Sequence, residues 1–199
     1  MKNISFSVVV ALFFVGCSEP SLPEVDFNPK DTIKGKSYKT QECRQEMAIG
    51  DDIIAEGRVD EIIIYKSQRK MDLYRNGTLV DTLPVSLGRN PEGHKEKRGD
   101  YRTPEGQYWI KRKLCSQKYY RSLCISYPRE EDVKKANAKG LNPGGDITIH
   151  AQPTWNASGV GDTYTFSKDW TQGCIAVSNR DMQRLWYAVR EGVSITIKK

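Results

Sequence analysis

The feature that most restricts the fold of this chain is a series of short β-type segments that begins after Gly57. Residues 59–65 read Val-Asp-Glu-Ile-Ile-Ile-Tyr, and β-branched and aromatic residues favour strands. Segments 70–74 and 78–87 flank Asn76-Gly77, a pair that tolerates the positive φ angles of a two-residue hairpin turn. The pattern therefore predicts a mostly β domain that opens with a strand and a hairpin.

Two later segments carry helix signals. Residues 130–139 start with acidic side chains and stop at Gly140, as a short helix does. Ser178 and Asn179 offer an N-cap for a second helix, which would end at Gly192. The apolar residues of this helix share one face, at i, i+3, i+4 and i+7: Met182, Leu185, Trp186 and Val189. The polar residues 88–102 predict a loop, and further strands are predicted over 106–114, 122–127, 146–150 and 193–197.

The start of the chain has the features of an export signal. Lys2 supplies a positive charge, and residues 8–15 form an apolar run far shorter than the roughly 20 residues that a membrane-spanning helix needs. We therefore predict that residues 1–16 are a signal peptide. The ending Phe-Val-Gly-Cys at 14–17 resembles the lipobox of bacterial lipoproteins, which implies lipidation at Cys17.

The residues after the lipobox indicate where the protein would reside. Residues 17–56 contain Pro20, Pro23 and Pro29 and lack apolar periodicity, so we expect a lipid-anchored tether that leads to a domain at 57–199. Ser18 after the lipidated cysteine implies sorting to the outer membrane. The expected location is the periplasm, on the inner leaflet of that membrane, with the lipid as the only membrane contact.

Charge and composition narrow the function classes. The formal net charge is +6, but the basic residues form no block and do not alternate with stacking aromatics, so a nucleic-acid partner is not expected. The chain has two histidines and no Cys-x-x-Cys pair, which argues against a zinc site. It also has no glycine-rich phosphate loop, so we expect neither metal nor cofactor.

Four cysteines remain after Cys17, and an oxidising compartment favours disulfides among them. Cys115 and Cys124 are close enough in sequence to face each other across a hairpin, and Cys43 could pair with either. If Cys115 pairs with Cys124, then Cys43 and Cys174 are left over. An unpaired thiol in an exported protein usually has a reason to stay free.

The surroundings of Cys174 suit a nucleophile. Gly173 lets the backbone approach a ligand closely or adopt a positive φ, and an apolar, strand-like run follows the cysteine. A thiol at the start of a strand can meet a substrate carbonyl, while backbone N–H groups beside the glycine donate to the oxyanion. The alternative is a buried cysteine that packs as a small apolar side chain beside Ile175.

A thiol nucleophile needs a base or a cationic partner, and the chain offers His94 and His150. His94 lies in the charged segment 93–98, where a solvated histidine is expected. His150 ends the predicted strand 146–150 and begins a loop, where a sheet presents functional side chains. His150 is therefore the predicted partner of the thiol, and the alternative is a histidine satisfied at a strand end.

Three segments in this order resemble the L,D-transpeptidase (YkuD-like) catalytic domain. They are Gly-Asp-Tyr-Arg-Thr-Pro-Glu-Gly at 99–106, Gly-Asp-Ile-Thr-Ile-His at 145–150 and Thr-Gln-Gly-Cys-Ile at 171–175. The resemblance covers about residues 57–199. It implies an L,D-transpeptidase-like β-sandwich, with the cysteine and the histidine at the mouth of a substrate groove, to which the two predicted helices are added.

The family's reaction gives these residues their implied roles. Cys174 would attack the carbonyl of the third residue of a peptidoglycan stem peptide, usually a diaminopimelate, and D-Ala would leave a thioester behind. His150 would be the general base, oriented by the backbone carbonyl of Ala151, and the N–H groups of Gly173 and Cys174 would form the oxyanion hole. The residues expected to contact the substrate are Arg102, Trp170, Thr171 and Gln172.

The acyl acceptor is left open by the sequence. Many family members have Gly, His and Arg where this chain has Ala151, Gln172 and Ala176. The form Asp-Trp-Thr-x-Gly-Cys-Ile-Ala at 169–176 resembles a subgroup that includes an enzyme cutting the bond between peptidoglycan and Braun-type lipoprotein.

Three functions are compatible with these features. An amine from another stem peptide or from a wall-linked lipoprotein would make the protein a transpeptidase, while water would make it an amidase or carboxypeptidase. The third alternative is a non-catalytic wall-binding lipoprotein. In each case we expect a monomer.

Overall fold

The computed structural model describes Cys43 and residues 58–199, so the predicted signal peptide, the lipidation site Cys17 and, apart from Cys43, the predicted tether lie outside the described residues. The described strands are, in chain order, β1 (Val59–Tyr65), β2 (Lys70–Arg75), β3 (Thr78–Pro84), β4 (Gly106–Ser116), β5 (Tyr120–Ile125), β6 (Thr148–His150), β7 (Ile175–Ala176) and β8 (Val189–Lys198). The helices between residues 58 and 199 are α2 (Glu130–Ala138), the 3₁₀ turn η3 (Thr154–Asn156), α3 (Asp162–Phe166) and α4 (Asn179–Ala188). Within this part of the chain, no helix has the length and apolarity that crossing a membrane requires.

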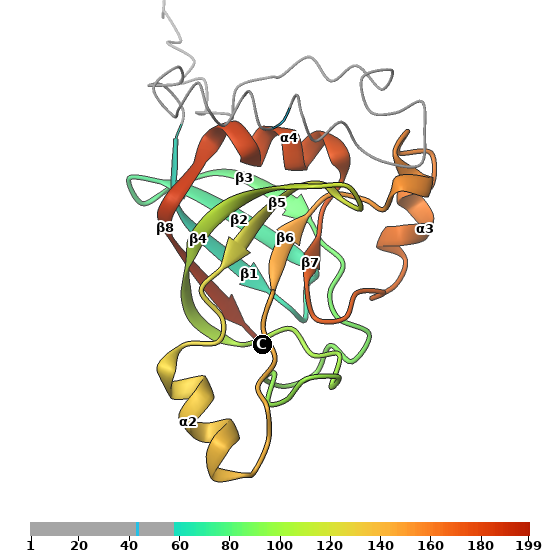
Figure 1. Cartoon of the computed structure of the whole chain (residues 1–199). Coiled ribbons are helices and arrows are strands. Elements are labelled where there is room, and N and C mark those ends of the chain that lie inside the picture. The colour runs from blue at the N-terminus through green and yellow to red at the C-terminus, as the bar shows by residue number, and fades with distance from the viewer. Residues whose placement is uncertain (1–42, 44–57) are drawn as a thin grey trace, which may run out of the picture.

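The eight strands form one curled sheet in the order β3-β2-β1-β8-β4-β5-β6-β7 (Figure 1). β4 belongs to both halves of the sheet, because residues 106–109 pair with β8 and residues 110–116 pair with β5. The segment after β3 closes the curl: Ser86 N donates to Ala176 O at 2.9 Å, and Ala176 N donates to Ser86 O at 2.8 Å. β7 is therefore hydrogen-bonded to β6 on one edge and to Ser86 on the other. The predicted mostly β fold is confirmed.

A single apolar core fills the curl of the sheet. Both halves of the sheet contribute fully buried side chains to it, among them Ile62, Ile64, Leu73, Ile110, Leu123, Ile149, Ile175 and Ile195. α4 lies across one end of this core (Figure 1) and buries Met182, Leu185 and Trp186 against it. The predicted apolar face of that helix therefore packs on the sheet.

The predicted hairpin is confirmed. Asn76 and Gly77 have φ angles of 50° and 74°, which is the pair of positive values that a type I′ turn requires. β3 ends earlier than the predicted residue 87, because its ladder stops where Lys70 opens β2 opposite Pro84. The residues beyond Pro84 pair with β7 instead.

α4 begins at the predicted N-cap, where the Ser178 hydroxyl accepts a hydrogen bond from the backbone of the first turn. Its predicted end at Gly192 is wrong. The helix ends at Ala188, because Val189 opens β8 and pairs with Val59 of β1. Gly192, with φ at 87°, lies instead in the irregular part of the β1–β8 register. The apolar periodicity extended through Val189 because this side chain is buried in the sheet.

The prediction of two helices missed α3. This helix and η3 lie in the connection between β6 and β7, and Asn156 holds the connection together. Its Nδ2 donates to Asp162 Oδ1 at 2.8 Å and to Gln152 Oε1 at 3.3 Å, and its Oδ1 accepts from Gly161 N at 2.6 Å. A helix of five residues is too short to show apolar periodicity, so the sequence pattern contained no signal for it.

The predicted Cys115–Cys124 disulfide is wrong. Cys115 is bonded to Cys43, and Cys124 is a buried free thiol. The register of the β4–β5 hairpin explains the difference, because it places Arg121 opposite Cys115 and Arg112 opposite Cys124. The disulfide therefore joins residue 43, which precedes the domain, to the end of β4.

Removing this disulfide is expected to lower the free energy of unfolding by about 2–4 kcal/mol, because the bond closes a long loop, with 72 residues of sequence separation. Urea unfolding of wild type and Cys43→Ser, each with and without dithiothreitol, measures the effect. Reductant should destabilise the wild type and leave Cys43→Ser unchanged. An equal response of the two proteins would contradict the Cys43–Cys115 pairing.

Candidate active site

The parallel pairing of β6 with β7 brings the predicted nucleophile and base together. Ile149 lies opposite Ile175, and both side chains are fully buried in the core. Side chains alternate along a strand, so Thr148 and His150 project from the opposite face of β6. Cys174 immediately precedes β7 and lies beside Thr148, whose Oγ1 donates to Cys174 Sγ at 3.7 Å.

The turn into β7 requires a glycine at Gly173. Its φ is 123°, and a Cβ at this position would lie 2.6 Å from Arg102 O. Thr171 Oγ1 accepts from Gly173 N at 3.0 Å and donates to Cys174 O at 2.7 Å, which holds the turn in one conformation. The Thr-x-Gly-Cys pattern is thus a rigid turn that presents the thiol.

The predicted oxyanion donors differ in availability. The N–H of Gly173 is already used by the Thr171 hydroxyl, so the prediction for Gly173 needs correction. The N–H of Cys174 donates to no group in the part of the chain that the structure describes. Cys174 N–H is therefore the free donor beside the thiol, and Gly173 contributes backbone shape.

The upstream Thr-Pro motif supports this turn from behind. Thr103 is fully buried, and its Oγ1 accepts from Gly88 N at 3.0 Å. The preceding residue, Arg102, meets Gly173 through its backbone carbonyl only. Its side chain turns toward His94 O and lines a cavity other than that of Cys174, and its predicted substrate contact stays a prediction.

His150 is held as a buried, neutral imidazole. Its Nδ1 lies 2.7 Å from Ala151 O, and because a carbonyl oxygen only accepts, Nδ1 carries the proton and Nε2 keeps the lone pair. Tyr119 stacks on the ring with centroids 4.2 Å apart, and Trp170 meets it edge-on at 5.6 Å. Burial lowers the pKa of His150 to about 4, against a smaller opposing effect of the Ala151 carbonyl.

The Cys174 thiol is also neutral at rest. Its S–H donates to Asp146 O at 3.6 Å, and burial raises the pKa of the thiol more than the hydrogen bonds from Thr148 lower it. No hydrogen bond between the described side chains joins Cys174 to His150. The resting pair is therefore a thiol and an imidazole rather than a thiolate and an imidazolium.

Cys174 and His150 line the same cavity, which has a volume of about 700 Å³. Cationic side chains from the β3–β4 connection and from the β4–β5 turn line it: Arg89, Lys95, Arg98 and Lys118. Asp146 is the acidic residue among the lining residues, and Lys95 is paired with Asp100 at 2.8 Å. This charge suits a substrate that carries carboxylates. The predicted substrate contacts that line the cavity are Trp170, Thr171 and Gln172.

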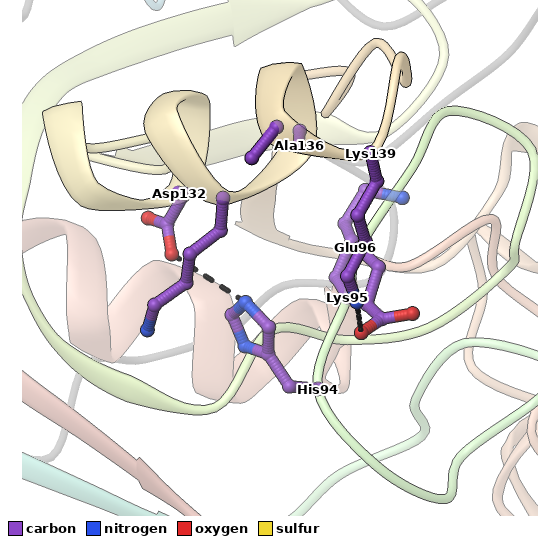
Figure 2. A pocket seen from close by; sticks show the side chains of 8 residues that line it. His94, Lys95, Glu96, Asp132, Ala136 and Lys139 are labelled. Carbon is purple, nitrogen blue, oxygen red and sulfur yellow. Dashed lines mark hydrogen bonds and ion pairs between the residues drawn. The ribbon is translucent and has the colours of Figure 1, made fainter.

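His94, the other histidine, lies at a second cavity of about 330 Å³ beside α2 (Figure 2). Its Nδ1 accepts from Glu105 N at 3.0 Å, and its Nε2 is 3.4 Å from Asp132 Oδ1. A Glu96–Lys139 ion pair of 2.7 Å spans the same cavity. Both nitrogens of His94 contact groups outside the Cys174 cavity, namely Glu105 N and Asp132 Oδ1. His150 is therefore the histidine available to the thiol.

Sequence reasoning missed two side chains of the site. Thr148 could have been found, since a residue two positions before His150 on a strand shares its face. Tyr119 could not, because it lies in the β4–β5 turn and reaches His150 only through the pairing of β5 with β6, which sets Ser122 opposite His150. Between residues 58 and 199 and at Cys43, no three His, Cys, Asp or Glu residues are grouped to hold a metal ion.

Substituting Gly173→Ala is expected to lower the free energy of unfolding by about 2–4 kcal/mol, because the new Cβ would meet Arg102 O and the positive φ would be strained. Gly192→Ala is the matched control, since Gly192 also has a positive φ but no atom within 4 Å of its added Cβ. That control should cost about 1 kcal/mol. Equal losses in urea unfolding would argue against a steric requirement at Gly173.

The pKa of His150 predicts a pH-dependent stability. Its folded pKa of about 4 lies below the unfolded value near 6.5, so the unfolded chain binds more protons between these pH values. The stability contribution is complete above pH 6.5 and is lost as the pH falls towards 4, by up to about 3 kcal/mol. His150→Gln should show a smaller decrease in urea unfolding from pH 7 to 4, and parallel curves for the two proteins would contradict the assignment.

The family comparison covers most of the described residues. The model of the YkuD L,D-transpeptidase catalytic domain matches residues 60–197. YafK of Escherichia coli (strain K12), named as a candidate L,D-transpeptidase, is 30% identical over 77 residues, which are 36% of this chain and 31% of YafK. The chain thus aligns with less than a third of that relative.

Solved structures share the fold. Pgp2 from Campylobacter jejuni, a helical cell shape determining protein, matches with a TM-score of 0.53 and 23% identity over 80% of this chain and 56% of its own. Bd1075 from Bdellovibrio bacteriovorus matches with a TM-score of 0.50 and 22% identity over 73% of this chain and 49% of its own. At 22–23% identity these two structures show the fold alone. The chain belongs to the YkuD L,D-transpeptidase catalytic domain family.

Proposed function

We propose that this protein is a peptidoglycan L,D-transpeptidase that works through a thioester on Cys174. The observation that carries the proposal is the shared cavity of Cys174 and His150, which adjacent strands present in a chain of this family. The cationic lining of the cavity supports a stem peptide as substrate, because such a peptide carries the carboxylates of D-Ala and diaminopimelate.

Acylation starts from the neutral pair. The Cys174 sulfur attacks the carbonyl carbon of the third stem residue while its proton passes to His150 Nε2, the nitrogen that keeps the lone pair. The carbonyl oxygen becomes an oxyanion, to which the free N–H of Cys174 donates. The C–N bond to D-Ala then breaks, the leaving amine takes the proton from His150, and a thioester remains.

Deacylation reverses the roles. An acceptor amine attacks the thioester carbonyl and gives its proton to His150 Nε2. The C–S bond breaks, and the sulfur takes the proton back, which regenerates the thiol. The new amide joins two stem peptides, or a stem peptide to a wall-linked lipoprotein. If water takes the place of the amine, the product is a carboxylate, and the protein is a hydrolase of the same class.

The export signal extends the proposal to location. With residues 1–16 removed, Cys17 would carry lipid and hold the protein at the inner leaflet of the outer membrane. Residues 17–56 would let the catalytic domain reach the wall from the periplasmic side of that membrane.

Incubation with defined muropeptides tests the proposal. Wild type should consume tetrapeptide stems and form new crosslinks, identified by mass, whereas Cys174→Ala should retain less than about 0.1% of the activity because the nucleophile is gone. Cys124→Ala is the matched control, since it removes the other free thiol and should stay active.

The other outcomes separate the alternatives. Hydrolysed products without crosslinks would replace the transpeptidase with a hydrolase. A carbapenem should add its mass to wild type and to Cys124→Ala but not to Cys174→Ala. If the wild type gives neither a product nor a carbapenem adduct, the remaining alternative is a non-catalytic wall-binding protein.

A further inference from the structure

The proposed reaction requires that the negative charge on the Cys174 sulfur be stabilised. The sulfur must become anionic during attack, yet the thiol is half-buried and desolvation raises its pKa. His150 accepts the proton but forms no hydrogen bond with the sulfur at rest, among the described contacts. A partly desolvated sulfur anion needs a hydrogen-bond donor, since desolvation without one penalises the charged form.

Within the described part of the chain, Asp146 and Thr148 bind the sulfur, and they act in opposite ways, with Thr148 lowering the pKa of Cys174 through a backbone hydrogen bond as well as through its hydroxyl. Asp146 O is 3.6 Å from Sγ and can only accept, so it suits the thiol and disfavours the thiolate. Thr148 Oγ1 is 3.7 Å from Sγ and can donate, so it suits the thiolate. Once the proton has left for His150, Thr148 supplies the donors to the sulfur, and its hydroxyl is the one that a substitution can remove.

We propose that Thr148 is a further catalytic residue of this site, whose hydroxyl donates to the Cys174 sulfur and stabilises it as a thiolate during attack. The inference rests on the proposed function, in which Cys174 is the nucleophile. Thr148 and His150 are two residues apart on β6, so one strand carries both the group that takes the proton and the group that stabilises the charge left behind.

The other charged or titratable groups near the sulfur do not supply this donor. Lys95 lowers the pKa of Cys174 through its charge but directs its Nζ to Asp100 at 2.8 Å. Cys124 lies opposite Thr148 on β5 and raises the pKa of Cys174. The Tyr119 pKa is raised by burial and by the Cys174 charge, and its ring stacks on His150 rather than on the sulfur.

The test compares Thr148→Val, which keeps the shape and removes the hydroxyl, with Thr148→Ser, which keeps the hydroxyl. The rate of alkylation of Cys174 by iodoacetamide is followed from pH 6 to 10 by mass spectrometry of the Cys174 peptide, which separates this thiol from Cys17 and Cys124. We expect Thr148→Val to lower the rate about tenfold near neutral pH and to move the thiol titration to higher pH, while Thr148→Ser stays close to wild type.

Muropeptide turnover gives a second readout. Thr148→Val should lower kcat/KM about tenfold with KM nearly unchanged, because the donor acts on the sulfur and not on the bound peptide. Urea unfolding of each variant checks that the fold is intact, and Thr148→Ala replaces Thr148→Val if the latter does not fold.

The outcomes of the two readouts are distinct. Wild-type alkylation rates and pH profiles in Thr148→Val would overturn the inference, as would equal losses in the Val and Ser variants. If alkylation slows in Thr148→Val but wild type turns over no muropeptide, the hydrogen bond to the sulfur is supported and the proposed function is not.

Discussion

β6 and β7 make only a short parallel contact, and the position of every reacting group depends on its register. With Ile149 opposite Ile175, both isoleucines enter the core, and burying two such side chains contributes about 3–6 kcal/mol. A slip of one residue would bring polar side chains into the core, so the apolar pair fixes the register. The same register places Thr148, His150 and Cys174 on the outer face, where the cavity lies.

So short a contact needs support from outside, and the segment after β3 supplies it. Ser86 pairs with Ala176 through two backbone hydrogen bonds, and Leu87 binds Asp169 through its N–H at 2.9 Å. Asp169 also accepts from Arg69 Nε at 3.0 and 3.1 Å, which ties the chain before Trp170 to the β1–β2 turn. Charge-assisted pairs of this kind are strong when they are partly buried. The site therefore depends on residues about 100 positions apart in sequence.

What could be predicted from the sequence was local. The Asn76-Gly77 turn and the Ser178 cap act through their neighbours, so pattern and position identified both. Gly173 was also identified from its neighbours as a position that requires glycine, although its N–H donates to Thr171 Oγ1.

The remaining features depend on tertiary register. Cys43 and Cys115 are 72 residues apart, and no spacing rule distinguishes that pair from Cys115–Cys124. Tyr119 reaches His150 because β5 pairs with β6, and the Arg102 side chain binds His94 O from the neighbouring loop segment. These contacts require knowledge of which strands are neighbours, which the sequence pattern does not contain.

The neutral state of the site has a chemical consequence. With the pKa of His150 at about 4 and the pKa of Cys174 raised, transfer of the proton from sulfur to imidazole is uphill. A thiol that stays protonated is a poor nucleophile and oxidises slowly. Productive attack must therefore be coupled to substrate binding, because the developing oxyanion and the Thr148 donor together offset the cost of charging the pair. The partial desolvation that raises the pKa of the thiol also strengthens each hydrogen bond to the developing charge relative to the same bond in water.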